Sequence, residues 1–458
     1  MFGSNRLDLL ESLTQNLLRT TDNLINNVPV AWRNDSAAAP ANAASPDFKE
    51  TCYNTGSLFN GTCVISTGPG AKHGISVPQV GNLLWLMHVW HRAYVYKGYD
   101  QVELSNLFPL LARAVTYYSH ITAKNATKED EWLHIAPTKS PEYGDASDAN
   151  YDVALLRWGL GALLDAVDVA MLPAAVADPR VSLWRQMDAT LAPFPTDKAT
   201  GLLIGDKVEL AKGHRHFSHL FSLWPIKLLN LSDAADNALA VQSFDHWVSL
   251  KNLHGFSYTA IIPMNIMLGR KGAVFSNISL LFNEYITANT MYYEGKEWPC
   301  GETPPAAAAA LMDVMLMEWN DVISIFAGID DASIPDAAFA GLLAPSGFEM
   351  AARREKNATM FVQVTNAAGV LANRPSAKLA LLVDGMPLPW AAEPASVQFI
   401  PRTDGRGIVD VDLATLPKGA SVVFYSKAAK PAAFEIVPST TGDSADYNSW
   451  GLPRNPLV

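Results

Sequence analysis

The chain has 458 residues, of which 49% are hydrophobic and 17% are charged, and this is the composition of a folded globular protein. Its 34 Lys and Arg residues against 45 Asp and Glu residues give a formal net charge of −11, which argues against a nucleic-acid partner. The longest apolar runs fall short of the roughly 18 residues that cross a membrane, so we expect no membrane-spanning segment.

Up to about residue 340, apolar side chains recur with the 3.6-residue period of helices. The loops between these segments indicate antiparallel helix pairs rather than alternating strands and helices. Residues 28–79 form a long loop rich in small and polar residues, and loops of this size usually serve a site or wrap a surface. The predicted helices cover residues 7–26, 80–97, 101–123, 150–172, 180–192, 217–231, 234–252, 258–270, 276–288 and 305–326.

After about residue 344 the apolar period changes to two, which is typical of strands. This pattern predicts a small antiparallel β domain with strands at 360–366, 378–385, 396–401, 407–413 and 421–427. We therefore divide the chain into a helical domain (1–343), a C-terminal β domain (344–438) and an irregular tail (439–458).

The cellular compartment is indicated by two weak signals. Six sites fit the acceptor pattern for N-glycosylation, which favours a secreted protein or one of the secretory or vacuolar pathway, although the first residues lack the pattern of a signal peptide. Cys52 and Cys63 flank a short polar loop, where they either form a disulfide or remain free thiols.

Two carboxylates stand in loops that lead into predicted helices. Glu142 belongs to the stretch SPEYG, and Glu302 belongs to the stretch CGETPP. Such a pair can face one another across the mouth of a helical barrel, one as a general acid and the other as a general base. The alternative is that each carboxylate caps its helix or interacts with the helix dipole.

The stretch HRHFSHL brings His214, His216 and His219 close together in the sequence. A zinc site would need neutral imidazoles in tetrahedral geometry and usually a further ligand, and the spacing is not that of the helical zinc-protease motif. Contact with a substrate through Arg215 and His216 is the favoured interpretation, and purely structural packing is the alternative. We expect neither a bound metal nor a cofactor.

Aromatic residues suggest a sugar as the ligand. The chain has 12 Trp residues, and several of them lie in predicted loops or at helix ends. An indole stacks well on the apolar face of a pyranose, so Trp85 could form the floor of a sugar site, whereas core packing is the alternative. Tyr143 follows Glu142 and could touch substrate, and Asp152 begins a predicted helix as a cap or support.

Four motifs in this order resemble the catalytic domain of glycoside hydrolase family 95: SPEYG, YDVALLRWGL, HRHFSHLFSLWP and ETPPAAAAALMDVMLMEW. The resemblance implies a mainly α fold, an (α/α)6 toroid followed by a C-terminal β domain. It also implies an inverting α-L-fucosidase, or an α-L-galactosidase, that acts on oligosaccharides or glycans without a cofactor.

The resemblance further implies a role for each matched residue. Glu142 takes the place of the general acid. Glu302 stands where the family has an Asp as general base, and Glu294 and Glu297 remain alternatives for this role. The substrate would be held by Arg215, His216, Trp85 and Tyr143, with support from His214, His219 and Asp152.

One part of the family pattern is missing. The family carries an upstream pair of Asn residues that polarises the attacking water, and it would precede the helix predicted at 7–26. We therefore expect this chain to be the C-terminal part of a longer enzyme, with a toroid incomplete at its N-terminal end. The alternative is a catalytically inactive carbohydrate-binding remnant of such an enzyme.

Overall fold

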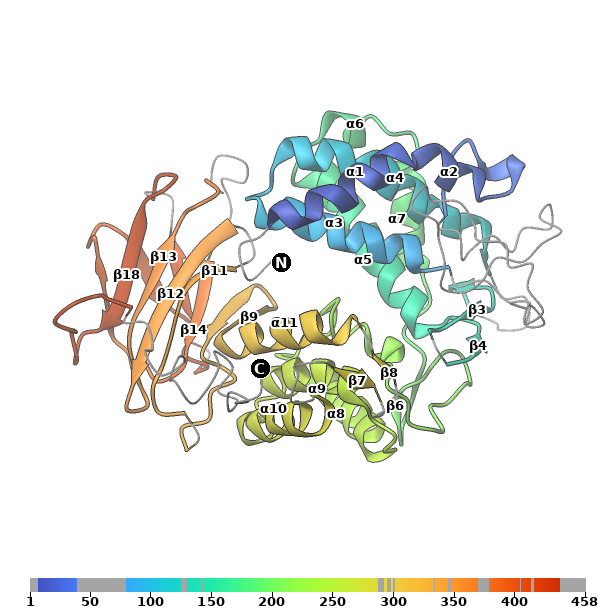
Figure 1. Ribbon diagram of the computed structural model, residues 1–458. Helices are drawn as coiled ribbons and strands as arrows, with labels where there is room; N and C mark the ends of the chain where they lie inside the picture. The colour runs from blue at the N-terminus through green and yellow to red at the C-terminus, as the bar shows by residue number, and fades with distance from the viewer. Residues whose placement is uncertain are drawn as a thin grey trace, which may run out of the picture.

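The computed structural model describes residues 7–38, 80–124, 130–141, 143–286, 292–294, 298–299, 301–332, 334–344, 347–369, 379–403, 405–412 and 416–436. Within these ranges, helices dominate up to residue 315 and strands dominate after it (Figure 1). Short two-stranded pairs interrupt the helical part, and the one that matters most for the site is β3 (Thr138–Lys139) with β4 (Asp145–Ala146).

A first group of helices, drawn in the upper half of Figure 1, shares one hydrophobic core. Its longest members bury a broad apolar face, including Leu84, Leu111 and Leu155. The group consists of α1 (Glu11–Arg19), α2 (Thr21–Asn26), α3 (Asn82–Tyr96), α4 (Gln101–Tyr117), α5 (Asn150–Asp168), α6 (Pro173–Val176) and α7 (Val181–Thr190).

A second group of helices lies below the first in Figure 1 and shares its core with the strands that follow. This core contains Trp247, Ile262 and Val314 from helices together with Met350 and Phe424 from strands. The helices are α8 (Ala234–Ser249), α9 (Gly255–Met267), α10 (Lys271–Tyr285) and α11 (Thr303–Met315).

Local sequence signals explain where several helices begin and turn. The Asp100 carboxylate accepts a hydrogen bond from the Glu103 N–H and caps α4, and Asp233 caps α8 in the same way. The turn from α9 to α10 contains Gly269 with a φ of 70°, a left-handed conformation that suits glycine.

Two five-stranded sheets form the C-terminal part, on the left in Figure 1. One has the order β16-β17-β14-β10-β9 and the other β11-β12-β13-β18-β15. The strands are β9 (Leu316–Trp319), β10 (Val322–Ile325), β11 (Ala337–Ala344), β12 (Phe348–Glu355), β13 (Ala358–Thr365), β14 (Leu379–Val383), β15 (Trp390–Glu393), β16 (Gln398–Pro401), β17 (Val409–Asp412) and β18 (Ser421–Ser426).

All five predicted strands are present, and the pairs that they form with one another are antiparallel. In addition, β14 pairs in parallel with β10, which lies before the predicted β domain. Strand β12 was not predicted although every second residue is buried. Its pattern is obscured by Arg354, a buried cation that pairs with Asp331 and Asp384.

Two predicted helices are wrong. The segment 217–231 contains only a short 3₁₀ turn, η5 (Ser218–Leu220). Pro225 lacks a backbone N–H, and Lys227 takes a left-handed φ of 59°, so a helix cannot continue there. The helix predicted at 305–326 ends at Met315, because Asn320 and Asp321 both have positive φ and form a tight hairpin turn between β9 and β10.

The long helices that frame the site run in the same direction. A Cβ on Gly81, just before α3, would lie 3.0 Å from an Asp152 oxygen at the start of α5. At the other end, a Cβ on Gly328 would lie within about 3 Å of both Ile266 in α9 and Val314 in α11. The beginnings of α3 and α5 therefore lie together beside Gly81, and the ends of α9 and α11 lie together beside Gly328.

The beginnings of these helices point toward the side of β3 and β4, and their ends point toward the sheets (Figure 1). The closed toroid, its incompleteness and the three domain boundaries stay predictions. No helix among the described residues is both long enough and apolar enough to span a membrane.

Candidate functional site

The β3–β4 hairpin presents residues 140–144 at the end of the molecule where the long helices begin. The hairpin is closed by hydrogen bonds from the Ser140 N–H to the Gly144 carbonyl (3.1 Å) and from the Tyr143 N–H to the Ser140 carbonyl (2.8 Å). Glu142, the predicted acid, stands between Pro141 and Tyr143 in the sequence and lies outside the described residues.

Both neighbours of Glu142 are attached to the loop 213–218. The Ser218 hydroxyl donates to the Pro141 carbonyl, so Ser140 donates in turn to Ser218 (2.9 Å between the two Oγ atoms). On the other side, the Tyr143 hydroxyl donates to the His216 carbonyl. The two halves of the predicted site are therefore held together at both flanks of Glu142.

The loop itself is held by side chains at four successive carbonyl groups. Each carbonyl accepts one hydrogen bond from a residue of another segment: Gly213 from Asn252 (3.0 Å), His214 from Trp247 (3.3 Å), Arg215 from Ser257 (3.0 Å) and His216 from Tyr143. Gly213 is required by packing as well, because a Cβ there would lie 1.8 Å from the Lys251 carbonyl oxygen. The backbone of 213–216 is thus fixed while Arg215 and His216 remain half-buried.

The histidine rings pack rather than converge on a point. His214 and His216 stack with their centroids 5.2 Å apart, and Tyr143 lies edge-on to His214 (5.6 Å) and His219 (5.5 Å). Among the described residues, no group of three His, Cys, Asp or Glu side chains is placed to hold a metal ion.

His219 is a buried neutral histidine. It is 1% exposed, and burial lowers its pKa to about 3. Its Nδ1 has no hydrogen-bond partner in the described part of the chain. His219 belongs to the short turn η5, and both His214 and His219 pack against Tyr143.

Asp152 holds the β3–β4 hairpin in place through hydrogen bonds. Its carboxylate accepts hydrogen bonds from the Tyr118 hydroxyl and the Thr138 hydroxyl, each 2.7 Å long. Burial raises the pKa of this carboxyl to about 6, while the two hydroxyl donors oppose that rise. Because Thr138 belongs to β3, Asp152 attaches the hairpin to α5 and to the turn after α4.

Trp85 is half-buried on α3 and packs between His88 and Phe221, each with a ring centroid 5.3 Å from its own. This packing fits the structural alternative, and its remaining exposed surface leaves room for ligand contact. Glu302 is exposed and immediately precedes α11, where its side chain makes no capping hydrogen bond. Since the long helices run in the same direction, Glu302 stands at the same end of the fold as the β3–β4 hairpin.

The two alternative candidates for the general base lie largely outside the described residues. Glu294 ends the short strand β7 (Tyr293–Glu294), of which only the backbone is described, and Glu297 is outside the described residues.

Comparison with known proteins identifies the family. The model of the glycosyl hydrolase family 95 catalytic domain matches residues 39–294, which is more than half of the chain. The chain belongs to this family. The match includes the β3–β4 hairpin and the loop 213–218, and it ends before Glu302.

Two other comparisons add no argument about function. No curated protein matches the chain. Among solved structures, a protein from the human microbiome that is assigned as a kojibiose phosphorylase matches with a TM-score of 0.47 and 10% sequence identity. The match covers 80% of this chain, and the chain spans about half (54%) of the length of that structure.

The residues that position the family 95 loops were missed in the sequence. Ser218, Trp247, Asn252 and Ser257 all donate to backbone carbonyls far away in the chain. The Ser257 hydroxyl also accepts a hydrogen bond from the His254 N–H (3.2 Å) at the start of α9, but the residues there do not follow the capping-box pattern that would have marked it in the sequence.

Proposed function

We propose that this family 95 chain hydrolyses a terminal α-L-fucosyl residue, or a related α-L-galactosyl residue, from an oligosaccharide or glycan. The observation that carries the proposal is the attachment of both flanks of Glu142 to the loop that bears Arg215 and His216. A general acid at position 142 would be joined through both of its chain neighbours to the loop that carries two side chains suited to hold sugar hydroxyls. Preorganisation of this kind is what positioned catalysis needs.

In the proposed reaction, Glu142 gives its proton to the glycosidic oxygen while the bond from that oxygen to the anomeric carbon breaks. Glu302 takes a proton from a water molecule that attacks the same carbon from the opposite face. The leaving alcohol departs with the proton of Glu142, and the sugar is released with inverted configuration. Inversion requires the two carboxyl groups to stand roughly 6.5–9.5 Å apart.

The test is release of L-fucose from α-L-fucosyl-(1→2)-lactose, with the first anomer formed observed by proton NMR. We expect Glu142→Gln and Glu302→Gln each to lower kcat by about 10² to 10⁴ without loss of the folded state, as expected for removal of a general acid or base. Glu294→Gln is the matched control and should remain active. Full activity in Glu142→Gln would reject the acid assignment, and loss in Glu294→Gln alone would move the base to that residue.

A non-catalytic carbohydrate-binding protein is the second candidate. It is favoured by the place of Glu302 beyond the matched family region. This candidate predicts that calorimetry detects saturable binding of the same trisaccharide, that His216→Ala abolishes the binding, and that no fucose is released under any condition. Release of fucose by the unmodified chain would exclude it.

A further inference from the structure

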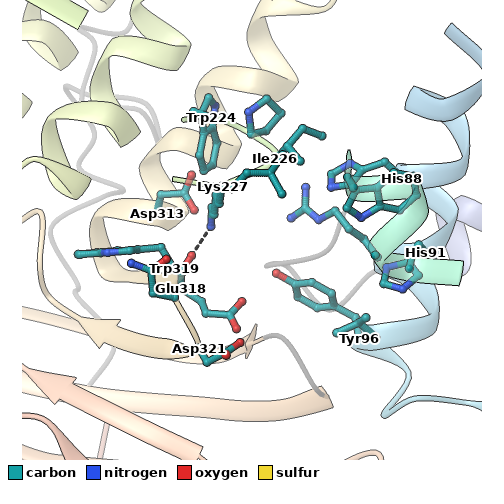
Figure 2. Close-up of a pocket in the computed structure, with 18 of the residues that line it drawn as sticks. His88, His91, Tyr96, Trp224, Ile226, Lys227, Asp313, Glu318, Trp319 and Asp321 are labelled. Carbon is teal, nitrogen blue, oxygen red and sulfur yellow. Dashed lines mark hydrogen bonds between the residues drawn. The ribbon is translucent and has the colours of Figure 1, made fainter. Parts of the chain in front are cut away.

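A cavity of about 680 Å³ lies at the opposite end of the long helices from the loop 213–218 and the β3–β4 hairpin, the loop cluster (Figure 2). Its wall is built from the C-terminal halves of α3, α5 and α11, the segment 224–228 and the turn between β9 and β10. The loop 213–218 and the β3–β4 hairpin contribute nothing to this wall. The cavity is therefore separate from the site proposed for hydrolysis.

The cavity contains charged groups of both signs that the proposed reaction does not use. Arg92 and Lys227 share it with Asp313 and Glu318, and Figure 2 shows Lys227 beside the two acids. The Lys227 ammonium donates to the Glu318 backbone carbonyl and lies 5.0 Å from the centre of the Trp224 ring. Lys227 lines the cavity from a backbone with a left-handed φ of 59°.

The carboxyl groups of Asp313 and Glu318 have raised pKa values because of burial. Burial raises the pKa of Asp313 to about 6 and that of Glu318 to about 7, and Lys227 and Arg92 oppose both rises. Near neutral pH, a carboxyl of this kind exists in both forms, so it both donates and accepts hydrogen bonds. Hydroxyl groups of a ligand need partners of both kinds.

Aromatic side chains supply the remaining wall. Tyr96, Trp158, Trp224 and Trp319 all line the cavity, and Figure 2 shows Trp224 and Trp319 on the same side as Asp313. Flat apolar rings combined with a few converging polar groups are typical of small-molecule sites, and the volume lies within the usual range for them.

We propose that this cavity is a second binding site, for a neutral saccharide of about two sugar units. The rings match the apolar faces of pyranoses, and the mixed carboxyl, ammonium and guanidinium groups match their hydroxyls. The cavity carries Arg92, Arg157 and Lys227 against Asp165, Asp313, Glu318 and Asp321, so no single sign of charge favours an ionic ligand. This inference does not rest on the proposed hydrolysis.

The test is isothermal titration calorimetry with lactose, cellobiose and maltose, each against the whole chain and its variants. We expect at least one disaccharide to bind, and we expect Trp319→Ala to weaken that binding at least tenfold. Trp319→Phe keeps an aromatic ring and should retain most of the affinity, which separates lost stacking from lost folding. Gln186→Ala, on the exposed face of α7 and outside both sites, should leave the affinity unchanged.

Three outcomes would overturn the proposal. The first is that none of the disaccharides binds, and the second is that Trp319→Ala binds as tightly as the unmodified chain. The third is loss of binding in His216→Ala alone, which would place the ligand in the loop cluster. A parallel titration with inorganic phosphate tests an ionic ligand, and phosphate binding without disaccharide binding would reject the neutral saccharide in favour of an anion site.

Discussion

The Tyr143 hydroxyl donates a hydrogen bond to the backbone carbonyl of His216, a residue 73 positions away in the sequence. It is one of four side-chain donors that hold the successive carbonyls of residues 213–216. Tyr143 is the only one of these four that belongs to the hairpin bearing Glu142. It therefore couples the position of the proposed acid to the proposed sugar-binding loop.

Replacing Tyr143 tests this coupling. Tyr143→Phe removes the hydroxyl and leaves the buried ring, so we expect a loss of about 1–2 kcal/mol in the free energy of unfolding and a drop in kcat of at least about tenfold. Ser257→Ala is the matched control, because it frees the Arg215 carbonyl without touching the hairpin. Urea denaturation and the fucose assay measure both effects. Equal losses of kcat in the two variants would contradict a special role for the hairpin contact.

Asp152 should matter for stability more than for chemistry. Asp152→Ala leaves the hydroxyls of Tyr118 and Thr138 without their acceptor and opens a small cavity, so we expect a loss of roughly 3 kcal/mol. Thr138→Val removes only one of the two hydrogen bonds and should cost about half as much. Chemical denaturation of both variants measures this difference, and an Asp152→Ala protein as stable as the wild type would contradict the proposed support of β3.

His219 should make the protein sensitive to mild acid. Its pKa in the folded state is about 3, below the ordinary value of 6.5, so the unfolded state takes up the proton first as the pH falls. Stability from this residue is complete above pH 6.5 and declines below it, by about 2 kcal/mol at pH 5. We expect His219→Gln to reduce the stability difference between pH 8 and pH 5 by this amount. An unchanged difference, measured by urea unfolding at both pH values, would show that His219 does not titrate in this way.

Glu318 should make the stability of the protein depend on pH in the opposite direction to His219. Its pKa in the folded state, about 7, lies above the ordinary value of 4.5, so the wild type loses stability as the pH rises between these values. Glu318→Gln removes this penalty and keeps the bond from Lys227, which goes to the backbone carbonyl. We expect the variant to be more stable than the wild type by about 3 kcal/mol at pH 8 and to have lost this advantage at pH 4. A variant that is no more stable than the wild type at pH 8 would contradict the raised pKa of Glu318.

Much of the fold was predictable because its signals are local. The helices α3, α4, α5, α8 and α9 each present apolar side chains at the helical period, and the strands from β13 to β18 that were predicted alternate in the same clear way. The two wrong helices also have local causes that were available in the sequence. Pro225 interrupts the first, and the pair Asn320-Asp321 at the turn of the β9–β10 hairpin interrupts the second.

The arrangement of the site depended on contacts between distant segments. Motif order was enough to indicate glycoside hydrolase family 95, whereas the roles of Glu142, Arg215 and His216 stay predictions. The residues that hold the 213–216 carbonyls, however, come from the hairpin, from α8 and α9 and from the turn between these two helices. Their side chains carry no pattern of their own, because a hydrogen bond to a backbone carbonyl can be made by any polar residue that the fold brings near.

The cavity at the opposite end of the long helices shows the same division most clearly. In the sequence, Asp313 only interrupts an apolar run, and Lys227 lies in a segment that resembles an amphipathic helix. Folding brings these two residues together with Arg92 and Glu318. Burial then raises the pKa of Asp313 and lowers that of Lys227. Periodicity and motifs thus determine helices, strands and family, whereas the electrostatic properties of a buried group depend on the tertiary structure, because they arise from the loss of water and from charges that are distant in the chain.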